Sequence, residues 1–229
     1  MYANVDILTN KLNEVESYAE LYEADLILIA EHLPKNPVNN YENIFNIPGF
    51  SCIEDCTGRG VCVFYKDGID IVNHMHINNL YHPSLFFNIR SQEKSLNLGL
   101  VYRSPNNDLT ENKKLNNQLN FASKKLKNLV VFGDFNHPHI DWHFNSCNKH
   151  EDHPDSLFLF EMLKIRTNQL ITNTTHHKPL CKPSLIDLVI TKVPELVTNI
   201  KHNPPIGKSH HDTITAVIDT GFVLNHKKK

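Results

Sequence analysis

The stretch LVVFGDFN, residues 129–136, is the part of the sequence that decides the fold. It begins with four consecutive apolar residues, 129–132, a pattern typical of a strand that is buried on both faces. Gly133 then allows the backbone to turn sharply as the strand ends. Asp134 and Asn136 follow, which predicts a carboxylate and an amide together at the sheet edge. Such a pair can activate a water molecule and hold a phosphate oxygen, although an Asx turn that closes a strand uses the same residue types.

Apolar runs of strand length alternate along the chain with a few segments of helical periodicity. We expect helices at residues 5–21, 109–127 and 155–165. We expect strands at residues 25–30, 61–65, 69–76, 85–90, 95–102, 129–132, 169–172, 185–191, 197–202 and 213–219. The turn signal at residues 66–68 predicts that the strands on either side of it pair as a hairpin. Many strands with few helices indicate two packed sheets with helices outside.

Length and charge limit the organisation of the chain. The 229 residues fit one domain, expected at residues 1–222, followed by a basic tail at 223–229. The 23 basic and 25 acidic residues nearly balance, which speaks weakly against a nucleic-acid partner, although a local basic rim or a bound cation could serve. The sequence shows neither a secretory signal nor an apolar run of about 18 residues, so we expect an intracellular protein without a membrane partner. Five cysteines without a CxxC pair are expected to stay reduced, although Cys52 and Cys56 could bridge.

Polar side chains recur at one kind of place, the ends of the predicted buried strands. They are Glu31, Tyr102, Asp134 with Asn136, Asp187 and His211. Asp187 lies inside an apolar run, and a buried aspartate needs a partner, which a histidine could supply. Each of these residues has a structural explanation when taken alone, such as a helix cap or a hydrogen-bonded core acid. Their recurrence at five strand ends favours a shared site.

Four stretches of the chain match the motifs of a known superfamily. They are residues 4–11 against NxxSLxNK, 58–66 against GGGVxxYxK, 101–106 against VYRPPN and 133–142 against GDFNxPxIDW. Through these motifs the chain resembles the endonuclease/exonuclease/phosphatase superfamily, and within it the endonuclease domains of non-LTR (LINE-type) retrotransposons. The resemblance runs from Tyr2 to Asp219. It implies a deoxyribonuclease I-like α+β fold, a four-layer α/β/β/α sandwich of two mainly antiparallel sheets flanked by helices, and Mg²⁺-dependent phosphodiester cleavage.

The resemblance also implies a role for each residue around the cation and the water. Glu31 would be the main Mg²⁺ ligand, because a hard carboxylate oxygen suits a hard ion, and Asn4 would help to orient the ligand shell. Mn²⁺ could take the place of Mg²⁺. Asp134 would orient and deprotonate the attacking water. Asn136 would hold that water or a phosphate oxygen.

A second set of residues is expected to act on the phosphate and on the rest of the substrate. Tyr102 and His211 would hydrogen-bond the pentacovalent phosphate. Asp187 would fix the His211 ring and favour its charged form. The residues expected to bind the substrate are Arg103, Thr175 and Ser209.

The chain departs from the family pattern in three places. The usual SDH sequence is Ser209-His210-His211 here, so a histidine replaces the acid that helps to hold the metal or the water in relatives. Asp212 follows, but alternation along an extended segment would turn it to the other face. The usual TET is Ala30-Glu31-His32, and the chain starts inside the first strand. A degenerate or truncated copy of an element has such features.

Three functions therefore stay open. The first is a nuclear endonuclease that nicks one strand of double-stranded DNA and leaves a 3′-hydroxyl from which a linked or associated reverse transcriptase primes. The second is another superfamily activity, such as abasic-site cleavage or inositol-phosphate hydrolysis. The third is a weakly active remnant that only binds DNA or a protein.

The histidines suggest one further alternative, a zinc site. Five of them lie close together in the sequence: His137, His139, His143, His150 and His153. Structural zinc sites usually need closely spaced Cys and His pairs, and a polar loop explains these histidines more simply.

Overall fold

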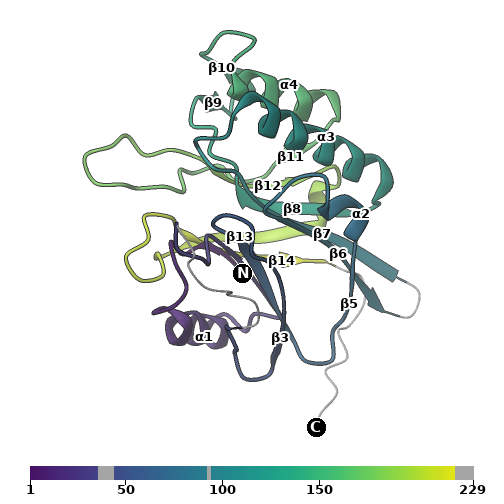
Figure 1. Ribbon diagram of the computed structural model, residues 1–229, viewed down its shortest axis with the longest axis vertical. Helices are drawn as coiled ribbons and strands as arrows, with labels where there is room; N and C mark the ends of the chain where they lie inside the picture. Colours follow the sequence, from purple (N-terminus) through teal and green to yellow (C-terminus); the bar gives the residue numbers. More distant parts are fainter. Residues whose placement is uncertain (36–43, 92–93, 220–229) are drawn as a thin grey trace.

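Two six-stranded sheets form the centre of the computed structural model, which describes residues 1–35, 44–91 and 94–219 (Figure 1). Sheet A contains, in spatial order, β13 (Val197–Asn203), β14 (Thr213–Ile218), β1 (Tyr2–Asn4), β2 (Leu26–Ala30), β4 (Val61–Lys66) and β3 (Phe50–Asp55). Sheet B contains β11 (Asn168–Gln169), β12 (Asp187–Thr191), β8 (Leu129–Asp134), β7 (Lys94–Tyr102), β6 (Ser84–Ser91) and β5 (Asp70–Asn73). Each sheet has one parallel pair, β1 with β2 and β7 with β8, and is otherwise antiparallel.

Helices cover the outer faces of the two sheets and complete a four-layer sandwich. Figure 1 shows α1 (Leu12–Leu21) on the outer side of sheet A, and α3 (Leu109–Lys125) and α4 (Pro154–Lys164) on the opposite side, over sheet B. The short α2 (Met75–Asn78) also packs on sheet B, and a two-stranded ribbon, β9 (Ile140–Asp141) with β10 (Ser146–Cys147), lies beside α4. A 3₁₀ turn, η1 (Pro194–Leu196), precedes β13. The expected α/β/β/α fold is confirmed.

Side-chain alternation along β2 explains how one strand serves two cores. Leu28 and Ala30 point to the core between the sheets, whereas Ile27 and Ile29 point to the core under α1. Successive residues of a strand face opposite sides, so a continuous apolar run is required where both sides are covered. The same argument explains the run 129–132, in which all four side chains are buried.

Gly133 has a different role from the one expected. It lies within β8 instead of at a turn, and it pairs with Val101 of the parallel strand β7. A Cβ atom at Gly133 would lie 2.2 Å from the Val101 carbonyl oxygen. The sequence therefore needs glycine here so that β7 and β8 can approach each other, which also brings Asp134 next to Tyr102.

Two local predictions were wrong. Residues 66–68 do not close a hairpin, because β4 belongs to sheet A and β5 pairs with β6 in sheet B. The turn instead carries the chain from one sheet to the other. The first helix begins at Leu12 and not at residue 5, since Asp6 and Ile7 have positive φ angles of 44° and 76°, which no helix accepts.

Some expectations lie outside what the structure describes. The basic tail at 223–229 falls within the undescribed residues 220–229. None of the helices in the described part of the chain has the length and apolar character needed to cross a bilayer.

Replacing Gly133 tests the close approach of β7 and β8. We expect Gly133→Ala to lower the free energy of unfolding by about 3 kcal/mol, the upper end of the usual cost of overpacking, because the added atom meets backbone that cannot rotate away. Gly58→Ala is the control: its Cβ would have nothing within 4 Å, and its φ of +59° should cost about 1 kcal/mol. Urea denaturation measures both, and equal losses would contradict the steric argument.

Candidate active site

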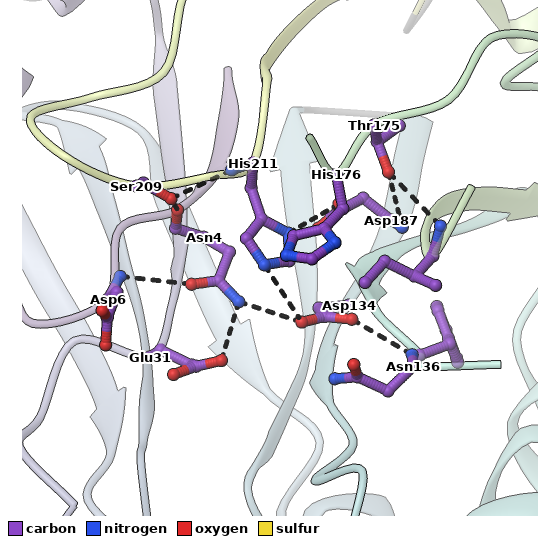
Figure 2. Close-up of polar contacts among 12 residues, drawn as sticks. Asn4, Asp6, Glu31, Asp134, Asn136, Thr175, His176, Asp187, Ser209 and His211 are labelled. Atoms are coloured by element: carbon purple, nitrogen blue, oxygen red, sulfur yellow. Dashed lines mark hydrogen bonds and ion pairs between the residues drawn. The ribbon is translucent and has the colours of Figure 1, made fainter. Parts of the chain in front are cut away.

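The strand ends gather six of the expected site residues at one edge of the sandwich. Figure 2 shows Asn4, Glu31, Asp134, Asp187 and His211 pointing toward one another, and Tyr102 lies near enough to Glu31 for that carboxylate to raise its pKa, after burial. Asn4 and Glu31 come from sheet A, at the ends of the parallel strands β1 and β2. The others come from the ends of β7, β8 and β12 in sheet B, and from the segment that leads into β14.

The Asn4 amide connects the two sheets at this edge. Its Nδ2 donates to Glu31 Oε1 and to Asp134 Oδ2, both at 2.9 Å. Its Oδ1 accepts from the Asp6 backbone N–H at 3.2 Å, which fixes the orientation of the amide. The Ser209 hydroxyl donates to the Asn4 carbonyl at 2.6 Å and so ties the last loop to the first strand. Asn4 therefore sets the separation of two carboxylates from different sheets.

Asp187 is the centre of a second, fully buried group. Its Oδ2 accepts from His211 Nδ1 at 2.8 Å, and its Oδ1 accepts from the Tyr2 hydroxyl at 2.7 Å. The Thr175 hydroxyl accepts from the Asp187 backbone N–H at 3.0 Å. With Nδ1 bound to Asp187, the other ring nitrogen of His211 points toward Asp134 Oδ2, 4.0 Å away (Figure 2).

Burial and neighbouring charges give these groups strongly shifted pKa values. Burial first, and next the charge of Asp187, raises the pKa of Asp134 well above its ordinary value. Burial also acts to raise the pKa of Asp187, but the charge and hydrogen bond of His211 outweigh it and lower that pKa. Burial acts against charge on His211, but the Asp187 carboxylate prevails and raises the pKa of His211 to about 9. At neutral pH, His211 is therefore a cation paired with an ionised Asp187.

Glu31 is held by donors on several sides. The Arg59 guanidinium Nη2 lies 2.5 Å from Oε2, and the same nitrogen pairs with Asp6. Tyr102 is buried near this carboxylate, so burial first and then the charge of Glu31 raise its pKa. Arg59 stands where the family motif has glycine, and the sequence analysis gave it no role.

Asn136 and Arg103 hold each other in place beside Asp134. The Asn136 backbone N–H donates to Asp134 Oδ1 at 3.1 Å, and its Nδ2 donates to the Arg103 carbonyl at 2.8 Å. The Arg103 guanidinium donates to the Asn136 carbonyl at 2.8 Å and to Asn112 Oδ1 at 2.6 Å. These bonds hold Asn136 at a positive φ of 49°.

The three residues expected to bind the substrate serve as internal supports. Arg103, Thr175 and Ser209 are all buried, and their polar atoms are engaged with Asn136, Asp187 and Asn4 as described above. In this structure their polar atoms position the residues that they hold, and their expected contact with a substrate stays a prediction.

His210 and Asp212 lie outside the cluster. His210 is exposed, and its carbonyl accepts from the His177 N–H at 2.7 Å. Asp212 pairs with His202 at 2.8 Å and with His177 at 3.4 Å, on the other side of the segment. Neither side chain thus fills the place of the acid that precedes the catalytic histidine in the family.

Besides Arg59, two residues of the site were missed by the sequence analysis. Tyr2, which binds Asp187, lies in a strand of only three residues at the very start of the chain. The His176 ring lies 4.6 Å from that of His211, and burial first, then the charge of His211, lowers the pKa of His176 to about 4. The alternation of Tyr2 with Asn4 on one strand was the only sequence signal that both residues face the same side.

The donor atoms at this edge fit a hard divalent cation. Asp134, Asp187 and His211 each offer an atom within 4.8 Å of the other two, and the Glu31 carboxylate is joined to Asp134 through Asn4. A protonated His211 donates and cannot ligate, so the ligands would be carboxylate oxygens. Such oxygens suit Mg²⁺ or Mn²⁺ better than softer metals.

The clustered histidines do not form a zinc site within the described residues. His137 is buried, stacks on Phe158 and bonds Asp155 at 3.0 Å, which makes it part of the core. Across residues 1–35, 44–91 and 94–219, none of the five histidines belongs to a group with metal-ligand spacing.

The fold and the family are supported by comparison with known proteins. A family model described as endonuclease-reverse transcriptase matches residues 96–215. The endonuclease domain of TRAS1, a telomere-specific non-LTR retrotransposon, has 16% identity and a TM-score of 0.73 over 96% of both chains. A 3′-5′ exonuclease from Neisseria meningitidis has 13% identity and a TM-score of 0.67 over 95% of this chain and 98% of its own.

An AP endonuclease from Leishmania major, at 12% identity, has a TM-score of 0.67 over 93% of this chain and 85% of its own. No curated protein matches the sequence. The solved structures share the fold, and the family model covers more than half of the chain, including β7, β8 and β12. From this match and this fold it follows that the chain belongs to the endonuclease-reverse transcriptase family of the endonuclease/exonuclease/phosphatase superfamily.

Proposed function

We propose that the chain is a Mg²⁺-dependent endonuclease that nicks one strand of double-stranded DNA. The observation that carries this proposal is the convergence of Asn4, Glu31, Asp134, Asp187 and His211 at one edge of the sandwich. Membership of a nuclease and phosphodiesterase superfamily supports the same reaction class. Mn²⁺ would replace Mg²⁺, since the carboxylate ligands suit both ions.

Each residue of the site has a separate role in the in-line attack of water on the phosphorus. Asp134 accepts the proton of the attacking water, and Asn136 positions that water. His211, held as a cation by Asp187, donates a hydrogen bond to the phosphate as negative charge develops. Glu31, Asp134 and Asn4 would hold the cation, which supplies further neutralisation of that charge. Tyr102 hydrogen-bonds a phosphate oxygen.

The family supports a biological use. Attack of water on the phosphorus with the 3′ oxygen as the leaving group breaks the bond to that oxygen and leaves a 3′-hydroxyl and a 5′-phosphate, and the family description pairs this domain with a reverse transcriptase. We propose that a linked or associated reverse transcriptase primes from that hydroxyl, in the nucleus where the target DNA lies.

A second candidate, a weakly active DNA-binding remnant, is favoured by two observations. The Arg59 guanidinium occupies Glu31 Oε2, so a cation must compete with an internal ion pair. His210 is exposed where relatives carry an acid. Both features reduce the negative charge available for the cation.

Loss of the general base should remove the activity. We expect Asp134→Ala to slow Mg²⁺-dependent conversion of supercoiled plasmid to open circles by about 100-fold to 10,000-fold, because general-base catalysis is worth that much. Asp152→Ala, at an exposed aspartate paired only with the exposed His150, is the matched control and should cut at the wild-type rate. Nicking by Asp134→Ala at the control rate would refute the assignment.

Restoring the family acid should separate the two candidate functions. We expect His210→Asp to raise the nicking rate about 10-fold or more, since it adds a carboxylate next to His211. His177→Asp, which adds the same charge to an exposed position nearby, is the control. If the wild type shows no nicking and His210→Asp does, the remnant hypothesis is correct for the natural sequence.

The pH dependence of the nicking rate should show the ionisation of His211, which is paired with Asp187. His211 acts in its protonated, charged form. This form is fully populated well below the pKa of about 9 and is lost as the pH rises through that value. We expect the nicking rate to fall on the alkaline side near pH 9.

Asp187→Asn removes the charge that raises this pKa, so the alkaline limb should move to lower pH. Tyr2→Phe removes only a hydrogen bond to Asp187, so it should shift the alkaline decline of the nicking rate by less. NMR titration of His211 measures its pKa directly in each variant. An alkaline decline that stays at the wild-type pH in Asp187→Asn would contradict the proposal that Asp187 raises the pKa of His211.

A further inference from the structure

A second group of metal-ligand side chains lies on the opposite face of sheet A, away from the interior of the sandwich. Cys52, Glu54 and Cys56 alternate along β3 and the residue after it, so their side chains share one face. Glu54 pairs directly with Cys62 of β4, which places Cys62 on that face as well. Burial first, and then the neighbouring Cys52, Glu54 and Cys56, raise the pKa of the Cys62 thiol, so these groups lie close to one another.

His32 points into this group and lacks a hydrogen-bond partner. Its side chain is fully buried, and neither ring nitrogen bonds any other residue in the described structure. Its Nε2 lies 3.6 Å from Glu54 Oε2, too far for a hydrogen bond. An unbonded buried polar group is costly, so a buried imidazole aimed at a carboxylate and a thiol favours the binding of a ligand at this place.

The backbone keeps the His32 ring in this position. A Cβ atom at Gly60 would lie 2.3 Å from His32 Cε1, so the ring rests directly on the Gly60 backbone. Phe45 closes the other side with an edge-on ring contact at 5.8 Å. The ring therefore has little room to turn its nitrogens elsewhere.

The geometry points to a structural zinc-type site formed by His32, Glu54 and Cys56. One donor atom from each of the three lies within 4.8 Å of the other two. In a tetrahedral zinc site with the usual metal–ligand distances of about 2.0–2.3 Å, the ligand atoms lie roughly 3.2–3.8 Å from one another. The donor atoms of this group would therefore need to approach one another by about 1 Å to bind the ion. Imidazole with thiolate selects Zn²⁺ or Co²⁺ over the Mg²⁺ that suits the oxygen ligands of the active site.

A disulfide between Cys52 and Cys56 does not explain this group as well as metal binding does. They are four residues apart on an extended segment, so their Cα atoms are about 13 Å apart. A disulfide requires Cα atoms within about 7 Å. All five cysteines lie in the described residues, and none is in a disulfide.

The position of this site connects it to the segments that carry Glu31 and Arg59. His32 directly follows Glu31, and the Glu31 N–H donates to the Gly60 carbonyl at 3.0 Å. The Leu33 N–H donates to the Arg59 carbonyl, also at 3.0 Å. An ion between His32 and Cys56 would thus fasten the end of β2 to the turn before β4.

Cobalt binding tests the site without any readout of nuclease activity. The full chain, metal-free and kept reduced with a phosphine, is titrated with Co²⁺ in the presence of excess Mg²⁺. We expect sulfur-to-cobalt charge-transfer absorption that saturates at one equivalent. Since the active-site cluster contains no cysteine, this absorption reports only the new site. Zn²⁺ should abolish it by displacement and raise the melting temperature of the wild type.

Two variants and a control decide the outcome. Cys56→Ser and His32→Asn should each weaken Co²⁺ binding at least tenfold. Cys181→Ser, at an exposed cysteine outside the group, should match the wild type. Far-ultraviolet circular dichroism confirms that each metal-free variant is folded. Absence of the absorption in folded wild type, or its full retention in Cys56→Ser and His32→Asn, would overturn the proposal.

Discussion

Hydrogen bonds between the two sheets at a single edge hold the candidate active site together. The Asn4 amide, from sheet A, donates to Asp134 of sheet B, and Tyr2 of the same short strand donates to Asp187. Both bonds are short enough to require that the sheets stay at a fixed spacing. That spacing is set by the apolar core between them, which includes Leu28, Val130 and many other side chains. The geometry of the site thus depends on the packing of the whole sandwich and not on one loop.

The same edge concentrates charges that repel one another. Glu31, Asp134 and Asp187 bring three carboxylates together, and Arg59 and His211 oppose them there. Burial acts to raise the pKa of both aspartates, but the charge and hydrogen bond of His211 outweigh it at Asp187, so the pKa is raised at Asp134 and lowered at Asp187. A divalent cation would relieve the remaining repulsion and lower the pKa of Asp134 toward its ordinary value. Arg59 relieves part of it without a metal, which is the physical basis of the weak-activity alternative.

Strand-end reasoning predicted which side chains come together at this edge, and its gaps have local causes. Glu31 and Asp134 follow buried apolar runs, and the structure places them beside each other across the two sheets. Asp187 lies inside such a run, and its partner is the predicted histidine, His211. The sequence does not show that the Arg103 guanidinium turns inward to Asn112.

The fold was predicted at the level of layers but not in every connection. The order of apolar runs indicated two sheets, yet the turn at residues 66–68 has the composition of a hairpin, and only tertiary pairing reveals that it joins different sheets. The sharp turn assigned to Gly133 failed for a related reason. A glycine that permits close strand approach and a glycine that permits a turn have the same sequence signal.

Backbone strain at the site argues that its geometry is functional. Glu31 has a positive φ of 55°, a conformation that glutamate rarely adopts, and it does so at the residue that pairs with Arg59. Two bonds fix it there: the Ile7 N–H donates to the Glu31 carbonyl at 2.8 Å, and the Glu31 N–H donates to Gly60. Such strain costs about 1–3 kcal/mol and persists only where the surroundings impose it. Because Ile7 has positive φ as well, the chain strains two segments to present one carboxylate, and a purely structural Glu31 would give no reason for both.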